Sequence, residues 1–386
     1  MRREADSQGT SYIFVDNVRF WSMFSIVAMH SLEVFGLMKQ TAPKLSMVLT
    51  TPFKFGTIGF FLISGFLMGD GLKTAHPGAY MQKRLKKIFL PWLFWFSLML
   101  VYLAGVNEVH THMGIRFDAA GSRIFGRLLY LDLFGTAFWF VPNLLLGMYV
   151  LVVLRKYADD LRLGAGLLVI NMFYVVNIYG RWMPSVHTEA VLGFVFYLWL
   201  GGYAARRYER LTAWLRGVPM SLLMGAMVVA AGCAFAEGMW LKALGTDGSN
   251  TLRLSNQVFA VLVVMVFVKL KKVASPRFVQ VRRETFGLYL SHAMLLDIVL
   301  RGVQAVFRMA PRGWLPTSSA GLVAEWLMVF AATYSAGIVV ARTLAGWDAT
   351  QWLVGLSAAR RPARTASVEE ETRADGEGLG VSLELS

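Results

Sequence analysis

Three ionisable residues, Asp16, Arg19 and His30, interrupt an apolar stretch near the start of the chain. Asp16 and Arg19 are three residues apart, so they are neighbours on a helix surface and can form an ion pair. Arg19 and His30 are eleven residues apart, which is close to three helical turns, and both therefore lie on one face, about 16 Å apart along the axis. Arginine binds anions, and histidine takes protons from hydroxyl groups. The spacing therefore predicts a channel that holds an anionic group at one end and performs proton transfer at the other.

Each of these residues also has a simpler interpretation. Asp16 and Arg19 are in that view interfacial anchors whose charged ends reach water. His30 is then a core histidine that is bonded to Glu33, one turn further along. Ionisable groups are costly to bury in a membrane and usually face a cavity or a partner. The shared face of Arg19 and His30 favours a functional role for the pair.

The elements that position these residues are predicted to be membrane-spanning helices. The chain has 386 residues, of which 56% are hydrophobic and only 16% charged, whereas soluble domains carry roughly 25% charged residues. Long apolar runs indicate helices, because barrel strands would alternate over about ten residues. We therefore expect an all-α, polytopic transmembrane bundle of about ten spans. The expected spans are 12–38, 51–72, 84–105, 136–155, 163–180, 188–205, 217–240, 254–271, 284–306 and 319–344.

The net charge of +14 is distributed between the apolar runs rather than along one basic stripe. This distribution favours topological loop charge over nucleic-acid binding. Lys and Arg are about twice as frequent in the loops on the side of the N-terminus, which predicts that both termini are cytoplasmic. We expect a cytoplasmic N-terminal segment at 1–11, a transmembrane domain at 12–345 and a disordered acidic cytoplasmic tail at 356–386.

Five motifs occur in an order that resembles the acyltransferase-3 family of membrane enzymes, which O-acylate envelope carbohydrates. The resemblance covers residues 12–345. The motifs are Asp16-x-x-Arg19 followed by His30; Phe60-Phe61-Leu62-Ile63-Ser64-Gly65-Phe66-Leu67; Tyr80 and Arg84-Leu85-Lys86-Lys87-Ile88 with Pro91; Trp139-Phe140; and Thr285-Phe286-Gly287-Leu288-Tyr289-Leu290-Ser291-His292.

Three positions depart from the family pattern. Asn17 stands where glycine is common, Trp21 where a small residue is common, and Lys87 where arginine is frequent. Arginine and lysine are not equivalent in bidentate phosphate contacts. The exact binding role of Lys87 is therefore left open.

The resemblance implies a stand-alone membrane O-acyltransferase of the bacterial inner membrane. It is expected to move a short acyl group, in the first place acetyl, from cytoplasmic acyl-CoA to a hydroxyl of an envelope or exported carbohydrate or glycolipid. Acyl-CoA is then a co-substrate, with no permanently bound cofactor, no metal and no nucleic acid, and membrane lipids surround the protein. The oligomeric state is left open.

The resemblance also implies roles for residues. His30 would be the general base, Arg19, Arg84 and Lys87 would bind the donor, and the supporting residues would be Asp16, Ser64 and His292. Alternatives stay open for three of these features: Ser64 with Gly65 is also typical of close helix packing, the basic cluster around Arg84 is typical of contact with anionic lipid, and His292 is a possible structural polar residue.

A different class of protein also fits the composition. Buried charges and many spans are typical of a transporter, here one for a carbohydrate or lipid-linked sugar. The spacing of Arg19 and His30 together with a basic cytoplasmic entrance favours the enzyme. No residue stands out as a nucleophile, so we expect direct transfer rather than an acyl-enzyme.

Overall fold

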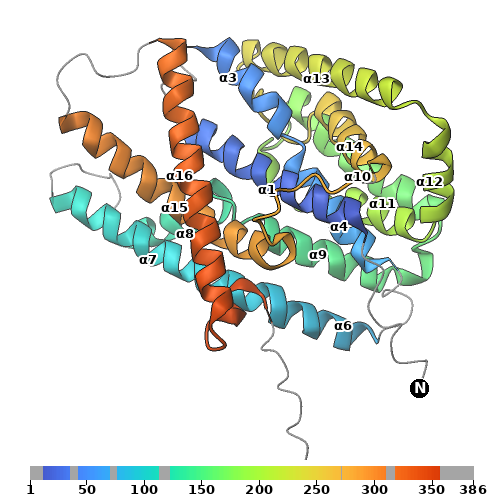
Figure 1. Ribbon diagram of the computed structural model, residues 1–386, viewed down its shortest axis with the longest axis horizontal. Helices are drawn as coiled ribbons and strands as arrows, with labels where there is room; N and C mark the ends of the chain where they lie inside the picture. Colours follow the sequence, from blue (N-terminus) through green and yellow to red (C-terminus); the bar gives the residue numbers. More distant parts are fainter. Residues whose placement is uncertain are drawn as a thin grey trace, which may run out of the picture.

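The computed structural model describes residues 12–34, 42–69, 76–112, 122–270, 272–309 and 318–356. These residues form helices and connecting turns without any strand among them, which confirms the all-α prediction for this part of the chain. The helices pack into one bundle (Figure 1). Their bounds are α1 (Ile13–Val34), α3 (Pro43–Thr50), α4 (Gly56–Met68), α6 (Pro77–Arg84), α7 (Leu90–His112), α8 (Ser122–Gly135), α9 (Phe140–Val153), α10 (Leu161–Gly180), α11 (Val195–Ala205), α12 (Tyr208–Gly217), α13 (Met220–Ala243), α14 (Leu254–Lys269), α15 (Val281–Met309) and α16 (Ser319–Gly346).

Six helical segments among the described residues are long and apolar enough to cross a membrane, or seven if the bent pair α8–α9 is one span. The helices of that pair meet at an angle of 68°. α1 falls short because Asp16, Asn17 and Arg19 lower its hydropathy, while α11 and α14 are apolar but short. The expected count of about ten spans and the cytoplasmic placement of the termini therefore stay predictions. The expected segment at 1–11 and the tail, apart from Leu356, lie outside the described residues.

Several helices start later than the expected spans, and α11 is the clearest case. α11 begins at Val195, whereas the expected span begins at residue 188. The preceding residues form turns, and the buried Asn171 side chain of α10 donates a hydrogen bond to the Gly193 carbonyl at 2.6 Å. This bond fixes an irregular segment in place of the first helical turns.

α1 runs through the middle of the bundle and contacts α4, α14, α15 and α16 (Figure 1). Glycines allow the close approach of α4 to its two neighbours. A Cβ on Gly59 would lie 2.5 Å from the Ser22 hydroxyl of α1. On the other side of α4, a Cβ on Gly65 would lie 1.9 Å from the Leu198 carbonyl oxygen of α11. Such close helix contacts are typical of small residues in membrane helices, and they fix the rotation of α4 beside α1.

The long segment from α6 to α7 contains one π-helical turn, η2 (Leu85–Phe89). Pro77 lies in the first turn of α6, where its missing N–H costs no hydrogen bond. π turns insert one extra residue into a helix and often occur at functional sites. Here the turn contains Lys87 and directly follows Arg84.

Two departures from the family pattern hold the segment that connects α14 to α15. The Asn17 amide donates to the Lys272 carbonyl at 2.9 Å and accepts from the Ala274 N–H at 2.8 Å. The Trp21 indole N–H donates to the Ala274 carbonyl at 3.1 Å. The start of α15 is thereby held beside the first turns of α1.

After α16 the chain folds back through a short turn, η5 (Gln351–Val354). The Trp95 indole of α7 donates to the Leu353 carbonyl at 3.0 Å. Gly355 has a φ of +73°, and a Cβ there would lie 2.6 Å from the Phe286 ring and 2.9 Å from the Lys87 carbonyl oxygen. The turn therefore needs glycine, and it brings the end of the described chain against η2 and α15.

Candidate active site

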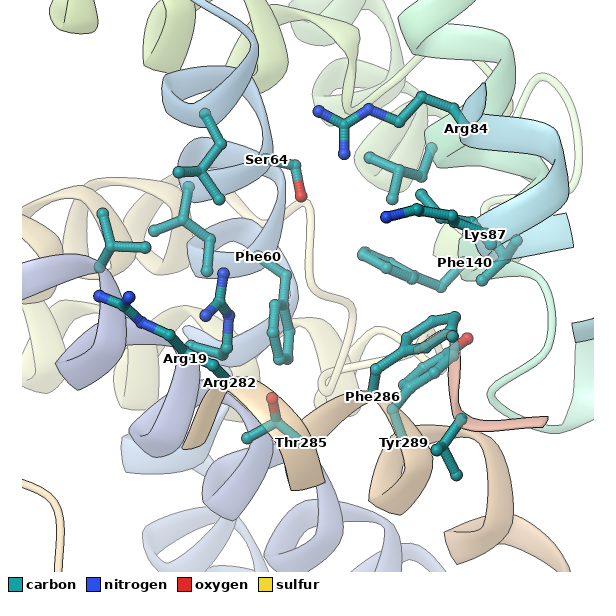
Figure 2. Close-up of a pocket in the computed structure, with 18 of the residues that line it drawn as sticks. Arg19, Phe60, Ser64, Arg84, Lys87, Phe140, Arg282, Thr285, Phe286 and Tyr289 are labelled. Atoms are coloured by element: carbon teal, nitrogen blue, oxygen red, sulfur yellow. The ribbon is translucent and has the colours of Figure 1, made fainter. Parts of the chain in front are cut away.

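A cavity of about 640 Å³ opens between α1, α4, η2, α9 and α15. Its lining includes one carboxylate, Asp16, and four cationic side chains. Figure 2 shows Arg19 and Arg282 on one wall, with Arg84 and Lys87 facing them from the opposite wall. The structure therefore brings together the three predicted donor-binding residues and adds Arg282, for which the sequence had indicated only loop charge. These four cations define the basic cavity, and their charge is of the sign that attracts an anion.

Asp16 joins the two arginines of its wall. Its carboxylate accepts from Arg282 Nε at 3.0 and 3.1 Å, with Arg282 Nη2 at 2.9 Å. It also accepts from Arg19 Nη1 at 3.3 Å. Arg282 lies seven residues before Tyr289, which is close to two helical turns, so the sequence did hold a signal that both face one side of α15.

Arg84 is held on the facing wall by Tyr80. Arg84 Nε donates to the Tyr80 hydroxyl at 3.2 Å, and the guanidinium lies 5.2 Å from the centre of the same ring. A guanidinium over an aromatic face is attracted by the ring quadrupole. This contact restrains Arg84 while its other donors stay directed at the basic cavity (Figure 2).

Ser64 lines the basic cavity, and its hydroxyl is directed into the space between the two walls (Figure 2). The next residue, Gly65, makes the close contact with α11 described above. Gly65 thus packs against α11, whereas Ser64 presents a polar group to the basic cavity.

Aromatic rings also line the basic cavity (Figure 2). The centres of the Phe60 and Phe140 rings are 6.0 Å apart, and those of Phe140 and Tyr289 are 5.5 Å apart. The Tyr289 hydroxyl donates to the Ala137 carbonyl at 2.5 Å, at the bend between α8 and α9. The basic cavity therefore offers aromatic as well as cationic surface.

The other end of α1 carries His30 and Glu33. His30 Nδ1 lies 3.4 Å from one carboxylate oxygen of Glu33, and the other oxygen accepts from Lys54 Nζ at 2.9 Å. The Lys54 side chain is fully buried. A carboxylate beside Nδ1 favours the tautomer with the proton on Nδ1, which leaves the lone pair on Nε2. The contact proposed as the simpler interpretation of His30 is therefore present, and it occupies one of the two ring nitrogens.

His292 of α15 lies between His30 and the basic cavity. Its ring centre is 5.5 Å from that of His30 and 5.8 Å from that of Tyr289, which lines the cavity. The His292 side chain is fully buried, and Nδ1 lies 2.5 Å from the Tyr289 carbonyl oxygen. Nε2 has no hydrogen-bond partner among the described residues.

A third histidine near this end, His187, was not singled out by sequence reasoning. It precedes α11 in a short turn, and its ring centre lies 5.5 Å from that of Trp139. Burial, followed by the charge of Lys54, lowers the pKa of the His187 imidazole to about 4. The ring is therefore neutral near pH 7, and its Nδ1 atom has no hydrogen-bond partner among the described residues. A lone histidine in a short turn carries no spacing signal, so only the fold places it here.

The described residues contain no group of three or more His, Cys, Asp or Glu side chains that could hold a metal ion.

Comparison with known proteins decides the family. Residues 12–342 match the family model described as "Acyltransferase domain", the model of the acyltransferase-3 family. The chain belongs to the acyltransferase-3 family. No curated protein and no solved structure matches it. This acyltransferase-3 protein is therefore a membrane acyltransferase, and the resemblance based on five short motifs is confirmed over nearly the whole chain.

Proposed function

We propose that this acyltransferase-3 protein transfers an acetyl group from acetyl-CoA to a hydroxyl of an envelope or exported carbohydrate. The observation that carries the proposal is the placement of four cations around the basic cavity, with His30 further along the same helix as Arg19. CoA is a long molecule with phosphates at one end and the thioester at the other. Arg19 and His30 are about 16 Å apart along α1, which suits an extended arm between them.

The donor phosphates bind between the two walls of the basic cavity. Charge-assisted bonds from guanidinium groups to phosphate oxygens are short and strong, and arginine forms them in pairs. The side chains that meet the phosphates are Arg19, Arg84, Lys87 and Arg282. The apolar pantetheine arm then passes Phe60, Phe140 and Tyr289, which places the thioester near His292.

His30 acts as the general base. Nε2 takes the proton of the acceptor hydroxyl while the hydroxyl oxygen attacks the thioester carbonyl, and the ester C–O bond forms as the C–S bond breaks. Glu33 fixes the tautomer of His30 and stabilises the imidazolium, as the carboxylate does in Ser-His-Asp triads. Lys54 holds Glu33. The acyl group passes directly to the acceptor, since the site offers no activated nucleophile.

The direction of transfer follows from the loop charges. The basic cavity opens to the cytoplasm, where acyl-CoA is made, and both termini lie on that side of the bacterial inner membrane. The acceptor approaches His30 from the outer leaflet or beyond. Surrounding lipid covers the apolar helix faces.

Purified protein in detergent or nanodiscs tests the proposal. Acetyl-CoA is expected to raise the melting temperature, and label from acetyl-CoA is expected to reach glycans of the envelope extract. His30→Gln should abolish transfer but not stabilisation, while the exposed His76 serves as a matched control through His76→Gln. Absence of stabilisation by acetyl-CoA, together with intact sugar transport in vesicles, would favour the transporter. Label that stays on denatured protein would contradict direct transfer.

A further inference from the structure

The acyl transfer moves a proton as well as an acetyl group. When the ester C–O bond forms and the thioester C–S bond breaks, the hydroxyl proton must finally reach the sulfur of CoA. In the proposed function, on which this inference rests, the hydroxyl lies at His30 and the sulfur arrives past Tyr289 from the basic cavity. The proton is therefore released on one side of the scissile bond and needed on the other.

His292 occupies the position between these two sites. Its ring contacts the ring of His30 at 5.5 Å between centres and that of Tyr289 at 5.8 Å. The side chain is fully buried, so bulk water cannot supply or remove a proton at this point. A group that exchanges protons here must therefore belong to the protein or the substrates.

The two ring nitrogens of His292 have different environments. Nδ1 lies 2.5 Å from the Tyr289 carbonyl oxygen, and a carbonyl only accepts, so Nδ1 carries a proton. Nε2 then carries a lone pair and has no partner among the described residues. Buried polar atoms without partners are rare and call for an explanation. When Nε2 gains a proton, the bond to the Tyr289 carbonyl stabilises the resulting imidazolium.

Neighbouring hydroxyl groups are engaged elsewhere. The Tyr289 hydroxyl donates to the Ala137 carbonyl at 2.5 Å, and the Ser291 hydroxyl donates to the Gly287 carbonyl at 3.0 Å. Neither proton is available for a leaving group. Among the described residues, His292 Nε2 is thus a buried atom beside Tyr289 with capacity for a further proton.

We propose that His292 is a second catalytic residue, which accepts the proton from the His30 imidazolium at Nε2 and donates it to the departing thiolate of CoA. One proton leaves the hydroxyl, passes over two imidazoles and ends on sulfur as the C–S bond breaks. Both histidines return to their neutral forms, and no further reactant is consumed.

The leaving group provides the test. Selenols are more acidic than thiols, so acetyl-selenocoenzyme A releases an anion that needs no protonation and keeps every contact of CoA to the basic cavity. His292→Asn retains an amide N–H near the position of Nδ1 and lacks Nε2. We expect its kcat with acetyl-CoA to fall about 100-fold or more, as for loss of a general acid, and its kcat with the selenoester to fall less than about tenfold. Equal losses with both donors would overturn the proposal.

Two controls separate this inference from the proposed function. His30→Gln is expected to lose activity with both donors. Wild-type protein that transfers acetyl from neither donor would contradict the proposed function itself, whereas active wild-type protein with equal losses in His292→Asn contradicts only the role of His292. His292→Gln, which offers an amide near Nε2 that cannot take up a proton, is expected to behave as His292→Asn does.

Wild-type protein gives an independent measurement that does not depend on the folding of a variant. The solvent deuterium isotope effect on kcat is expected to be larger with acetyl-CoA than with the selenoester, because only the thiolate requires the proton. The same isotope effect with both donors would contradict proton delivery to sulfur.

Discussion

The two ends of α1 carry similar pairs in different surroundings. Asp16 contacts Arg19 three residues later and Arg282 from α15, while Glu33 contacts His30 three residues earlier and Lys54 from the segment before α4. The pairs on α1 are about equally exposed, with Arg19 and Asp16 at 21% and 23% and His30 and Glu33 at 24% and 27%. The distant cations differ, because Arg282 is 60% exposed and Lys54 is fully buried. Arginine stays charged at all working pH values, and histidine exchanges its proton near neutrality. In the proposed function, one pairing geometry therefore serves anion binding at one end and proton transfer at the other.

The largest expected effect lies at the His30 end. His30→Gln should lower kcat by about 10²- to 10⁴-fold, the usual contribution of a general base. The melting-temperature shift caused by acetyl-CoA should stay unchanged, because the ring is remote from the phosphate-binding walls. Transfer of label from acetyl-CoA and thermal shift measure the two quantities, with His76→Gln as the control. A His30→Gln variant that keeps its activity would contradict the role of His30 as the general base.

The two carboxylates should differ in their effect on stability. Glu33→Gln leaves the Lys54 charge buried without its partner, which costs about 3–5 kcal/mol of unfolding free energy in comparable pairs. Asp16→Asn should cost about 1 kcal/mol or less, since its partners are partly solvated. Denaturant unfolding of the purified variants measures both. The double variant Glu33→Gln/Lys54→Met should recover most of the lost stability, and failure to do so would show that the pair is not the cause.

Loss of one cation from the basic cavity should weaken donor binding and spare the chemical step. Arg19→Gln and Arg282→Gln are each expected to raise the KM for acetyl-CoA about tenfold or more, the cost of a charge-assisted bond. Their kcat at saturating donor should stay within about threefold, since neither residue touches the reacting atoms. Arg216→Gln is the matched control, because Arg216 is exposed on α12. If the arginine variants changed kcat alone, donor binding in the basic cavity would be refuted.

The smallest expected effect concerns the contact of Lys87 with the donor phosphates. Lys87→Arg introduces a planar fork that binds phosphate oxygens in pairs, so the KM for acetyl-CoA should fall by about threefold. Steady-state kinetics with varied acetyl-CoA measures the change. A higher KM would contradict a paired contact between residue 87 and the donor phosphates.

Part of the site could be predicted from the sequence because it lies on one helix. The positions of Asp16, Arg19 and His30 follow from helical geometry alone, and α1 runs without a break from Ile13 to Val34. Partners from distant segments could not be predicted. Arg282 is 266 residues away from Asp16, and Lys54 reaches Glu33 only because α4 packs against α1. The sequence indicates only loop charges at Lys54 and Arg282, since composition does not distinguish a loop charge from a buried one.

The departures from the family pattern also depend on partners that the sequence does not reveal. Asn17 and Trp21 differ from the usual residues at their positions, and nothing nearby in the sequence explains them. Their hydrogen bonds go to the backbone at Lys272 and Ala274, so the explanation lies in the tertiary structure. Packing also separates Ser64 from Gly65, which the sequence presents as one motif. The type and approximate position of most helices followed from apolar runs, whereas the number of spans depends on how each polar helix lies in the membrane.

The central claim is that the Asp16 end of α1 binds the donor and the Glu33 end transfers the proton. Its most direct test compares Asp16→Asn with Glu33→Gln in one assay. Acetyl transfer is measured against acetyl-CoA concentration, at a temperature where both variants are folded. The account predicts a higher KM for acetyl-CoA with a near-normal kcat for Asp16→Asn, and a lower kcat with a near-normal KM for Glu33→Gln. The reverse pattern, or a loss of kcat alone in both variants, would contradict it.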